Sequence, residues 1–95
     1  MNDQPEIRHD PSGQRFHLEL DGQLAELVYH RAPDGRMVID HTGVPQAIGG
    51  RGLAGRLVQA AFDHARSQGW KVVPACSYAS AWIVRHPDYA DLVGE

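Results

Sequence analysis

The sequence predicts an α+β fold with a mixed sheet, in which an antiparallel three-stranded meander is followed by a strand–helix–strand unit. Apolar and polar side chains alternate over residues 14–44, as in half-buried strands, and turn sequences at 21–22 and 32–35 divide this stretch into three. Residues 53–68 instead repeat apolar side chains at helical spacing. The apolar run at 71–76 follows at once, which is typical of a strand parallel to the one before the helix.

Length and composition narrow the class of protein. The chain has 95 residues, which suits one small domain at 14–95, with a frayed end or short edge strand at 1–13. The net charge of −3 and the lack of a basic run argue against a nucleic-acid partner, and no apolar segment is long enough to cross a membrane. The single cysteine, Cys76, cannot form an internal disulfide. We therefore expect a cytoplasmic protein, a monomer or a weak homodimer.

Each strand of the meander has recognisable boundaries. The first begins at Gln14, the second covers Leu24–His30, and the third covers Met37–Val44. Pro45 ends the third strand, because proline has no N–H group to donate to a neighbouring strand. Strict alternation in the third strand predicts two opposite faces, one with Met37, Ile39 and His41 and the other with Val38, Asp40 and Thr42.

The remaining elements follow from glycine and proline positions. The long helix is expected to begin near Gly50–Gly52 and to end at Gly69, since a left-handed residue commonly follows a helix. Pro74 within the next strand indicates an edge, a bulge or a splayed strand.

The C-terminal segment predicts a short second helix. Ser77 is expected to cap a helix over Tyr78–Arg85, and His86-Pro87 would end it, because the residue before proline avoids helical angles. Residues 88–93 would form a final turn or a further short helix.

Four glycines, at 49, 50, 52 and 55, precede or open the long helix. The first N–H groups of a helix have no partner within it and lie at the positive end of its dipole, so they favour a phosphate. The alternative is that the glycines only allow a tight turn and close helix–sheet packing. A phosphate-loop nucleotidase is excluded, because no Gly-Lys-Ser or Gly-Lys-Thr sequence is present. Gly50, Gly52 and Gly55 do match a dinucleotide fingerprint, but the chain is too short for that doubly wound domain.

The order of elements and several separate motifs resemble the GNAT superfamily of N-acetyltransferases, in particular its small single-domain branch. The motifs are His41-Thr42-x-Val44-Pro45, Gly50-Arg51-Gly52-Leu53-Ala54, Val73-Pro74-x-Cys76-x-Tyr78 and His86-Pro87-x-Tyr89. The superfamily's cofactor motif is Gln/Arg-x-x-Gly-x-Gly/Ala. Gly52 and Ala54 match its last two positions, whereas Gly49 departs from the first and loses a side-chain contribution there.

The resemblance implies an acetyl-CoA-dependent transferase that acts on a small-molecule or protein amine. Backbone groups near Thr42 and Val44 would pair with the pantetheine arm, and the segment at 49–56 would hold the pyrophosphate of coenzyme A. The implied cofactor-binding residues are Thr42, Val44, Gly49, Gly50, Arg51, Gly52, Leu53, Ala54, Gly55 and Arg56. Arg51 and Arg56 have an alternative as ordinary solvated charges. The alternative function is a CoA-binding sensor or interaction module without turnover.

Three residues are candidates for catalysis. Cys76 is the active-site candidate that the resemblance implies, and it would either carry the acetyl group or only shape the pocket. If the amine attacks the thioester directly, His41 is the candidate base and Tyr78 the candidate acid. His41 has an alternative as a strand histidine bonded to backbone, and Tyr78 as a packing residue. The six histidines show no metal-ligand spacing, so no metal is expected.

Overall fold

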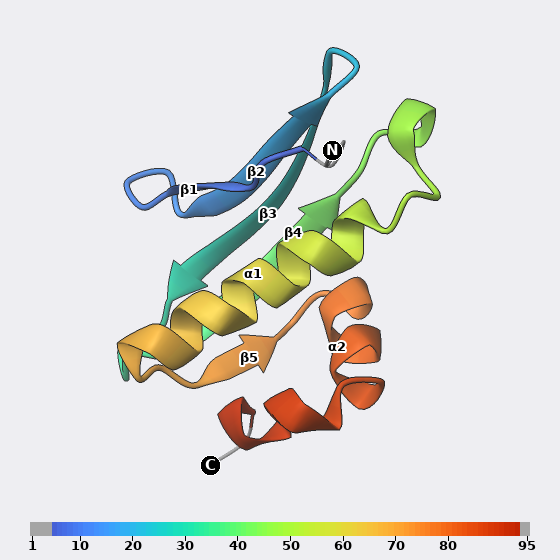
Figure 1. Cartoon of the computed structure of the whole chain (residues 1–95). Coiled ribbons are helices and arrows are strands. Elements are labelled where there is room, and N and C mark those ends of the chain that lie inside the picture. The colour runs from blue at the N-terminus through green and yellow to red at the C-terminus, as the bar shows by residue number, and fades with distance from the viewer. Residues whose placement is uncertain (1–4, 94–95) are drawn as a thin grey trace.

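The computed structural model describes residues 5–93 and shows one five-stranded sheet in the order β1-β2-β3-β4-β5. The strands are β1 (Arg8–Asp10), β2 (Arg15–Leu20), β3 (Gln23–Arg31), β4 (Met37–Gly43) and β5 (Val72–Pro74). The first four are antiparallel neighbours, and β5 runs parallel to β4. Helix α1 (Leu53–Gln68) lies across one face of the sheet, and α2 (Ser77–Val84) lies beside it after β5 (Figure 1). Short 3₁₀ turns cover Gln46–Ile48 and Pro87–Leu92. The predicted mixed sheet and fold class are confirmed.

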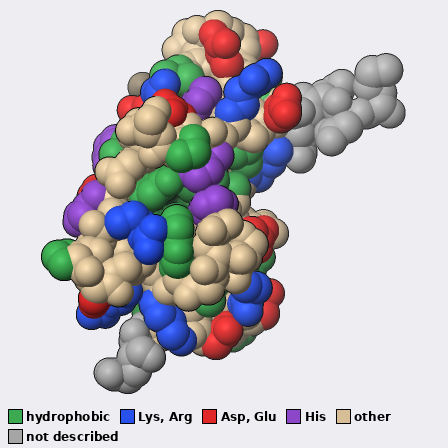
Figure 2. Space-filling view, turned by 90° about the vertical axis from the view of Figure 1, so that its left-hand side faces the viewer, with side chains coloured by type: hydrophobic (Ala, Val, Ile, Leu, Met, Phe, Trp, Pro, Cys, Tyr) green, Lys and Arg blue, Asp and Glu red, His purple; other side chains and the backbone are tan. Residues whose placement is uncertain are grey.

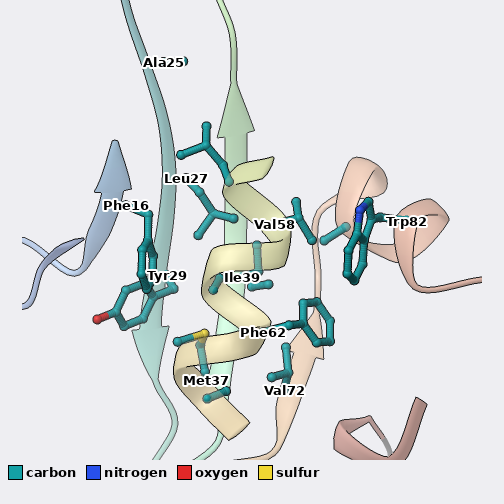
Figure 3. Close-up of a cluster of buried hydrophobic side chains, with 14 of the residues drawn as sticks. Phe16, Ala25, Leu27, Tyr29, Met37, Ile39, Val58, Phe62, Val72 and Trp82 are labelled. Carbon is teal, nitrogen blue, oxygen red and sulfur yellow. The ribbon is translucent and has the colours of Figure 1, made fainter. Parts of the chain in front are cut away.

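The core lies between the sheet and α1. Apolar side chains of β2, β3 and β4 meet the buried stripe of α1, and Trp82 closes the core from α2 (Figure 3). Burial of this kind contributes most of the favourable free energy of folding. Among residues 5–93, every side chain in the fully buried class is apolar or aromatic. The polar and reactive side chains of residues 5–93 therefore lie at the edges of the core or on the surface.

A β-bulge changes the predicted faces of β4. Val28 pairs with His41 and Tyr29 pairs with Ile39, so Asp40 is an extra residue without a partner on β3. The prediction that His41 shares a face with Met37 and Ile39 is wrong, because the inserted residue reverses the alternation beyond it. His41 lies with Val28 on the face away from α1, and Thr42, opposite Leu27, lies on the face that α1 covers.

The start of α2 also differs from the prediction. The N-cap is Cys76, whose Sγ accepts a hydrogen bond from the Ala79 N–H at 3.3 Å, and Ser77 is the first helical residue. Strand β5 ends early, at Pro74, because the Ala75 and Cys76 N–H groups both turn to the Ile39 carbonyl. The helix can therefore begin one residue sooner than expected.

Candidate functional site

Strands β4 and β5 separate after three residue pairs. Ile39 pairs with Pro74, and the Ile39 carbonyl accepts from both Ala75 and Cys76 at 3.1 Å. Beyond this point β5 turns into α2, whereas β4 continues to Gly43. From Asp40 to Gly43, the edge of β4 thus has no neighbouring strand on the side of β5 (Figure 1). We call the region between this edge and residues 75–76 the wedge. Unpaired strand edges offer backbone groups to an extended ligand.

The glycine-rich segment leaves a series of donors at the beginning of α1. Among the described residues, the backbone N–H groups of residues 50–55 donate to no protein acceptor, and Gly52, the N-cap, receives no side-chain cap. Gly50 and Gly52 have φ angles of 76° and 74°, which glycine adopts without strain. The Gly49 N–H is different, because it donates to the Gln46 carbonyl at 3.1 Å. The donors available to an anion therefore begin at Gly50.

The two arginines of this segment have different surroundings. Arg51 lies 3.5 Å from Asp21 in the β2–β3 turn, and both side chains are largely exposed. Arg56 is on the first turn of α1, and its Nη1 is buried without a hydrogen-bond partner among the described residues. Leaving a buried charged donor unpaired is unfavourable, so such an atom in a native structure calls for an explanation.

Thr42 and Cys76 meet across the wedge. Thr42 Oγ1 and Cys76 Sγ lie 3.5 Å apart, and Sγ also accepts from the Ala79 N–H. The sulfur is half-buried, at the N-terminus of α2 and the C-terminal end of β5. Cys76 is therefore held beside the unpaired edge of β4 by contacts from two other elements.

A hollow of about 240 Å³ adjoins the glycine-rich segment. Its lining consists of Val44, Gly49, Gly50, Gly52, Leu53, Ala54 and Tyr78. A second hollow of about 570 Å³, between α1 and α2, shares Gly52 and Tyr78 with the first. A Cβ built on Gly55 would lie 3.4 Å from the Tyr78 hydroxyl, so this glycine allows α2 to approach α1 closely. Tyr78 thus stands between the two hollows.

The predicted site residues fall into two groups. The glycine-rich segment, Thr42, Cys76 and Tyr78 gather around the wedge and its adjoining hollows. His41 is exposed on the other face of the sheet, where Asp40 and His30 form a hydrogen bond of 2.7 Å.

The sequence analysis did not single out Gln59, Arg85 or His86 as site residues, yet all three line the larger hollow. The spacing of Tyr78, Trp82 and Arg85, which places them on one face of α2, is the signal that could have found Arg85.

A mixed sheet that opens beside a helix with unpaired N-terminal donors presents backbone groups of the kind that suit an extended, phosphate-bearing ligand. A family model described as GCN5-related N-acetyl-transferase matches residues 15–92. The chain belongs to this family.

Curated relatives and a solved structure agree with that assignment. Protein NATD1 of Mus musculus is 32% identical over 85 residues, which cover 85% of this chain and 76% of the relative. Protein NATD1 of Danio rerio is 29% identical over 91 residues, covering 92% and 83%. The solution structure of a GCN5-like protein from Staphylococcus aureus is 33% identical, covers 94% of this chain and 87% of that one, and has a TM-score of 0.73. Within residues 5–93, the structure contains no helix that is both long and apolar enough to cross a membrane.

Proposed function

We propose that this protein transfers the acetyl group of acetyl-CoA to an amine. The observation that carries the proposal is the series of unpartnered backbone N–H groups at residues 50–55, at the N-terminus of α1. Such a series suits a pyrophosphate, and the unpaired edge of β4 nearby suits the amide groups of a pantetheine arm. The family assignment supports the same pairing of ligand and fold.

The thioester would lie where β4 and β5 separate, close to Thr42 and Cys76. In a direct transfer, the amine nitrogen forms a bond to the acetyl carbonyl carbon and the carbon–sulfur bond breaks. The amine gives up a proton to solvent water, because His41, the predicted base, lies on the other face of the sheet, and solvent restores the group that protonates the thiolate. The Tyr78 hydroxyl, at the adjoining hollow, is the candidate donor of a proton to the departing thiolate.

A two-step transfer through Cys76 uses the same residues. The Cys76 thiolate would attack the acetyl carbonyl carbon and release CoA as its thiolate. The amine would then attack the carbonyl of acetyl-Cys76, release the Cys76 thiolate and give up a proton to solvent, which protonates the CoA thiolate. The contacts of Cys76 support this role, because the Ala79 N–H donates to the sulfur and the Thr42 hydroxyl lies 3.5 Å from it. The two routes make different predictions for Cys76 variants, and both require that the protein binds acetyl-CoA.

Binding and turnover are tested separately. Thermal unfolding with CoA, acetyl-CoA or ATP should show stabilisation by the two CoA ligands above that by ATP, since only they bring a pantetheine arm to β4. Release of free thiol from acetyl-CoA is then followed with a panel of primary amines. Stabilisation without thiol release would favour the CoA-binding sensor, and equal shifts with all three ligands would contradict the proposal.

Substitution of Cys76 separates the two routes. Cys76→Ala removes both the nucleophile and the cap of α2, whereas Cys76→Ser keeps an oxygen that can accept from Ala79. In the two-step route, intact mass rises by one acetyl in the unaltered protein on exposure to acetyl-CoA and does not rise in Cys76→Ala. Unchanged turnover in both variants would assign Cys76 a packing role.

A further inference from the structure

The larger hollow, of about 570 Å³, is a candidate site of its own. It lies between α1 and α2, and its polar lining is supplied by Arg56, Gln59, Tyr78, Arg85 and His86. Both charged residues in this lining are arginines, and no carboxylate borders the hollow. A hollow bordered by two guanidinium groups and no acid suits a ligand with a negative charge.

The two arginines differ from most others in the chain. Arg15, Arg36 and Arg66 each bond a carboxylate within 3.1 Å. Among residues 5–93, neither Arg56 nor Arg85 has a salt bridge, and neither guanidinium has a hydrogen-bond partner. Arg56 Nη1 is, in addition, shielded from solvent. The Arg56 guanidinium borders the hollow and has no competing partner among the described residues, so its accessible nitrogens are free to donate to a phosphate oxygen, and a small rotation of the side chain would bring Nη1 to the ligand as well.

The larger hollow adjoins the place where the proposed function puts the pyrophosphate of CoA. It shares Gly52 and Tyr78 with the smaller hollow at the glycine-rich segment, so a chain-like ligand can pass from one into the other around the first turn of α1. Coenzyme A consists, in order, of the thiol, the pantetheine arm, a pyrophosphate and a 3′-phosphorylated adenosine. If the arm lies along β4 and the pyrophosphate at residues 50–55, the next portion along the molecule is the adenosine with its 3′-phosphate.

One wall of this hollow is flat and fixed. The His86 ring stacks on Trp82 with ring centroids 3.8 Å apart and an interplanar angle of 13°. His86 Nδ1 donates to the Trp82 carbonyl at 2.8 Å, which holds the ring in that orientation. Arg85 precedes this histidine at the C-terminus of α2, so the arginine is attached to a wall that is already ordered.

We propose that Arg85, together with Arg56, recognises the 3′-phosphate of coenzyme A in the hollow between α1 and α2, and so selects coenzyme A over its dephosphorylated form. The proposal rests on the proposed function and adds a specificity that the fold alone does not require. It also gives the unpartnered Arg56 nitrogen an acceptor.

The test compares two ligands that differ only in this phosphate. Binding of CoA and of 3′-dephospho-CoA is measured by calorimetry on the unaltered protein and on Arg85→Gln. The unaltered protein should bind CoA about tenfold or more tightly than dephospho-CoA, as expected for a charge-assisted hydrogen bond. Arg85→Gln should lose most of that difference while keeping its affinity for dephospho-CoA. The exposed Arg8, which lies 3.7 Å from Glu6, provides the control Arg8→Gln, which should keep the full difference.

The outcomes are distinguishable from failure of the proposed function. Equal binding of the two ligands by the unaltered protein would overturn the 3′-phosphate assignment while leaving CoA binding intact. An equal loss for both ligands in Arg85→Gln would also overturn it, because a specific contact must act on one ligand alone. Absence of binding by either ligand would overturn the proposed function and this inference together. Thermal unfolding of each variant without ligand verifies that α2 remains folded.

Discussion

Helix α1 begins and ends at glycines with nearly the same left-handed conformation, but its two ends have different surroundings. At the C-terminus, Gly69 has a φ of 76°, and its N–H donates to carbonyls of the last turn, while the Trp70 N–H donates to the Ala65 carbonyl at 2.9 Å. At the N-terminus, Gly52 has a φ of 74° and no side chain caps the helix. A left-handed glycine therefore accompanies satisfied carbonyls at the C-terminus and unsatisfied N–H groups at the N-terminus.

Side chains repeat this contrast. Near the C-terminus, Arg66 bonds both carboxylate oxygens of Asp91 at 3.1 Å, and Lys71 bonds the Asp91 carbonyl at 2.7 Å. Near the N-terminus, Arg56 Nη1 has no partner among the described residues. Polar groups at one end of the helix hold the fold together. At the other end, Arg56 Nη1 and the N–H groups of residues 50–55 have no protein partner among residues 5–93. Departures from local rules of this kind are expected where a protein binds something.

The largest effect is expected from removing the aromatic ring that links the elements around α1. Phe62 is fully buried and its ring lies 5.2 Å from that of Trp82 and 5.8 Å from that of Tyr89. Phe62→Ala should lower the free energy of unfolding by about 3–5 kcal/mol, because it removes a buried ring and leaves a cavity. Urea titration followed by circular dichroism measures this loss. Val84→Ala, at an 80% exposed position on α2, should change it by less than about 0.5 kcal/mol. Similar losses in both variants would contradict the core assignment.

An intermediate effect is expected from placing alanine at each end of α1. Gly52→Ala and Gly69→Ala should each lower the free energy of unfolding by about 1–2 kcal/mol, the cost of a left-handed alanine. An added Cβ meets nothing within 4 Å at either position, so the two losses should be alike. CoA binding should separate them, since Gly52 lines both hollows and Gly69 lines neither. Equal weakening of CoA binding by both variants would contradict the prediction that only the N-terminal end of α1 contacts CoA.

The sequence predicted those parts of the structure that depend on local patterns. The strand boundaries, the helix with its two glycine ends, and the parallel strand β5 all follow from periodicity and turn residues within a few positions of each other. Pro74, which cannot donate to a neighbouring strand, indicated an edge, a bulge or a splayed strand; β5 is the edge strand of the sheet, and its pairing with β4 ends at Pro74.

The errors concern features that depend on partners distant in sequence. The bulge at Asp40 arises from how β4 pairs with Val28 and Tyr29 of β3, and alternation within one strand contains no information on that pairing. Cys76 caps α2 because the Ile39 carbonyl draws the chain out of β5 early, which the residues around Ser77 do not indicate. The larger hollow likewise exists only because α2 packs against Gly55 of α1.

The smallest effect is expected from pH, at the edge of the sheet farthest from the wedge. His9 stacks on Phe16 with centroids 4.2 Å apart, lies 4.4 Å from the His64 ring and hydrogen-bonds the Tyr29 hydroxyl at 2.6 Å. The space-filling view shows histidine side chains among hydrophobic ones on one face of the molecule (Figure 2). Burial, and then the neighbouring His64, lower the pKa of His9, while Asp10 opposes this shift.

The sign of the pH effect follows from that direction. A histidine with a lowered pKa in the folded state binds protons more readily when unfolded, so its contribution to stability is present above the unfolded pKa of about 6.5 and declines as pH falls below it. The carboxyl of Asp10 titrates in a separate window, because hydrogen bonds from Gly13 and Ser12 lower its pKa from its ordinary value. Loss of stability between about pH 6.5 and pH 5 therefore reports on His9 and not on Asp10.

Urea midpoints at pH 7.5, 6.5, 5.5 and 5.0 measure this decline. His9→Phe retains an aromatic ring against Phe16 and removes the titrating group, so the variant should show a shallower decline over the same range. His86→Phe is the matched control, since His86 also stacks on an aromatic ring but lies on the side of the molecule with α2. The control should keep the full decline. A decline of the same size in His9→Phe would place the pH dependence elsewhere and show that the edge at β1 is no more sensitive to acid than the side of the molecule with α2.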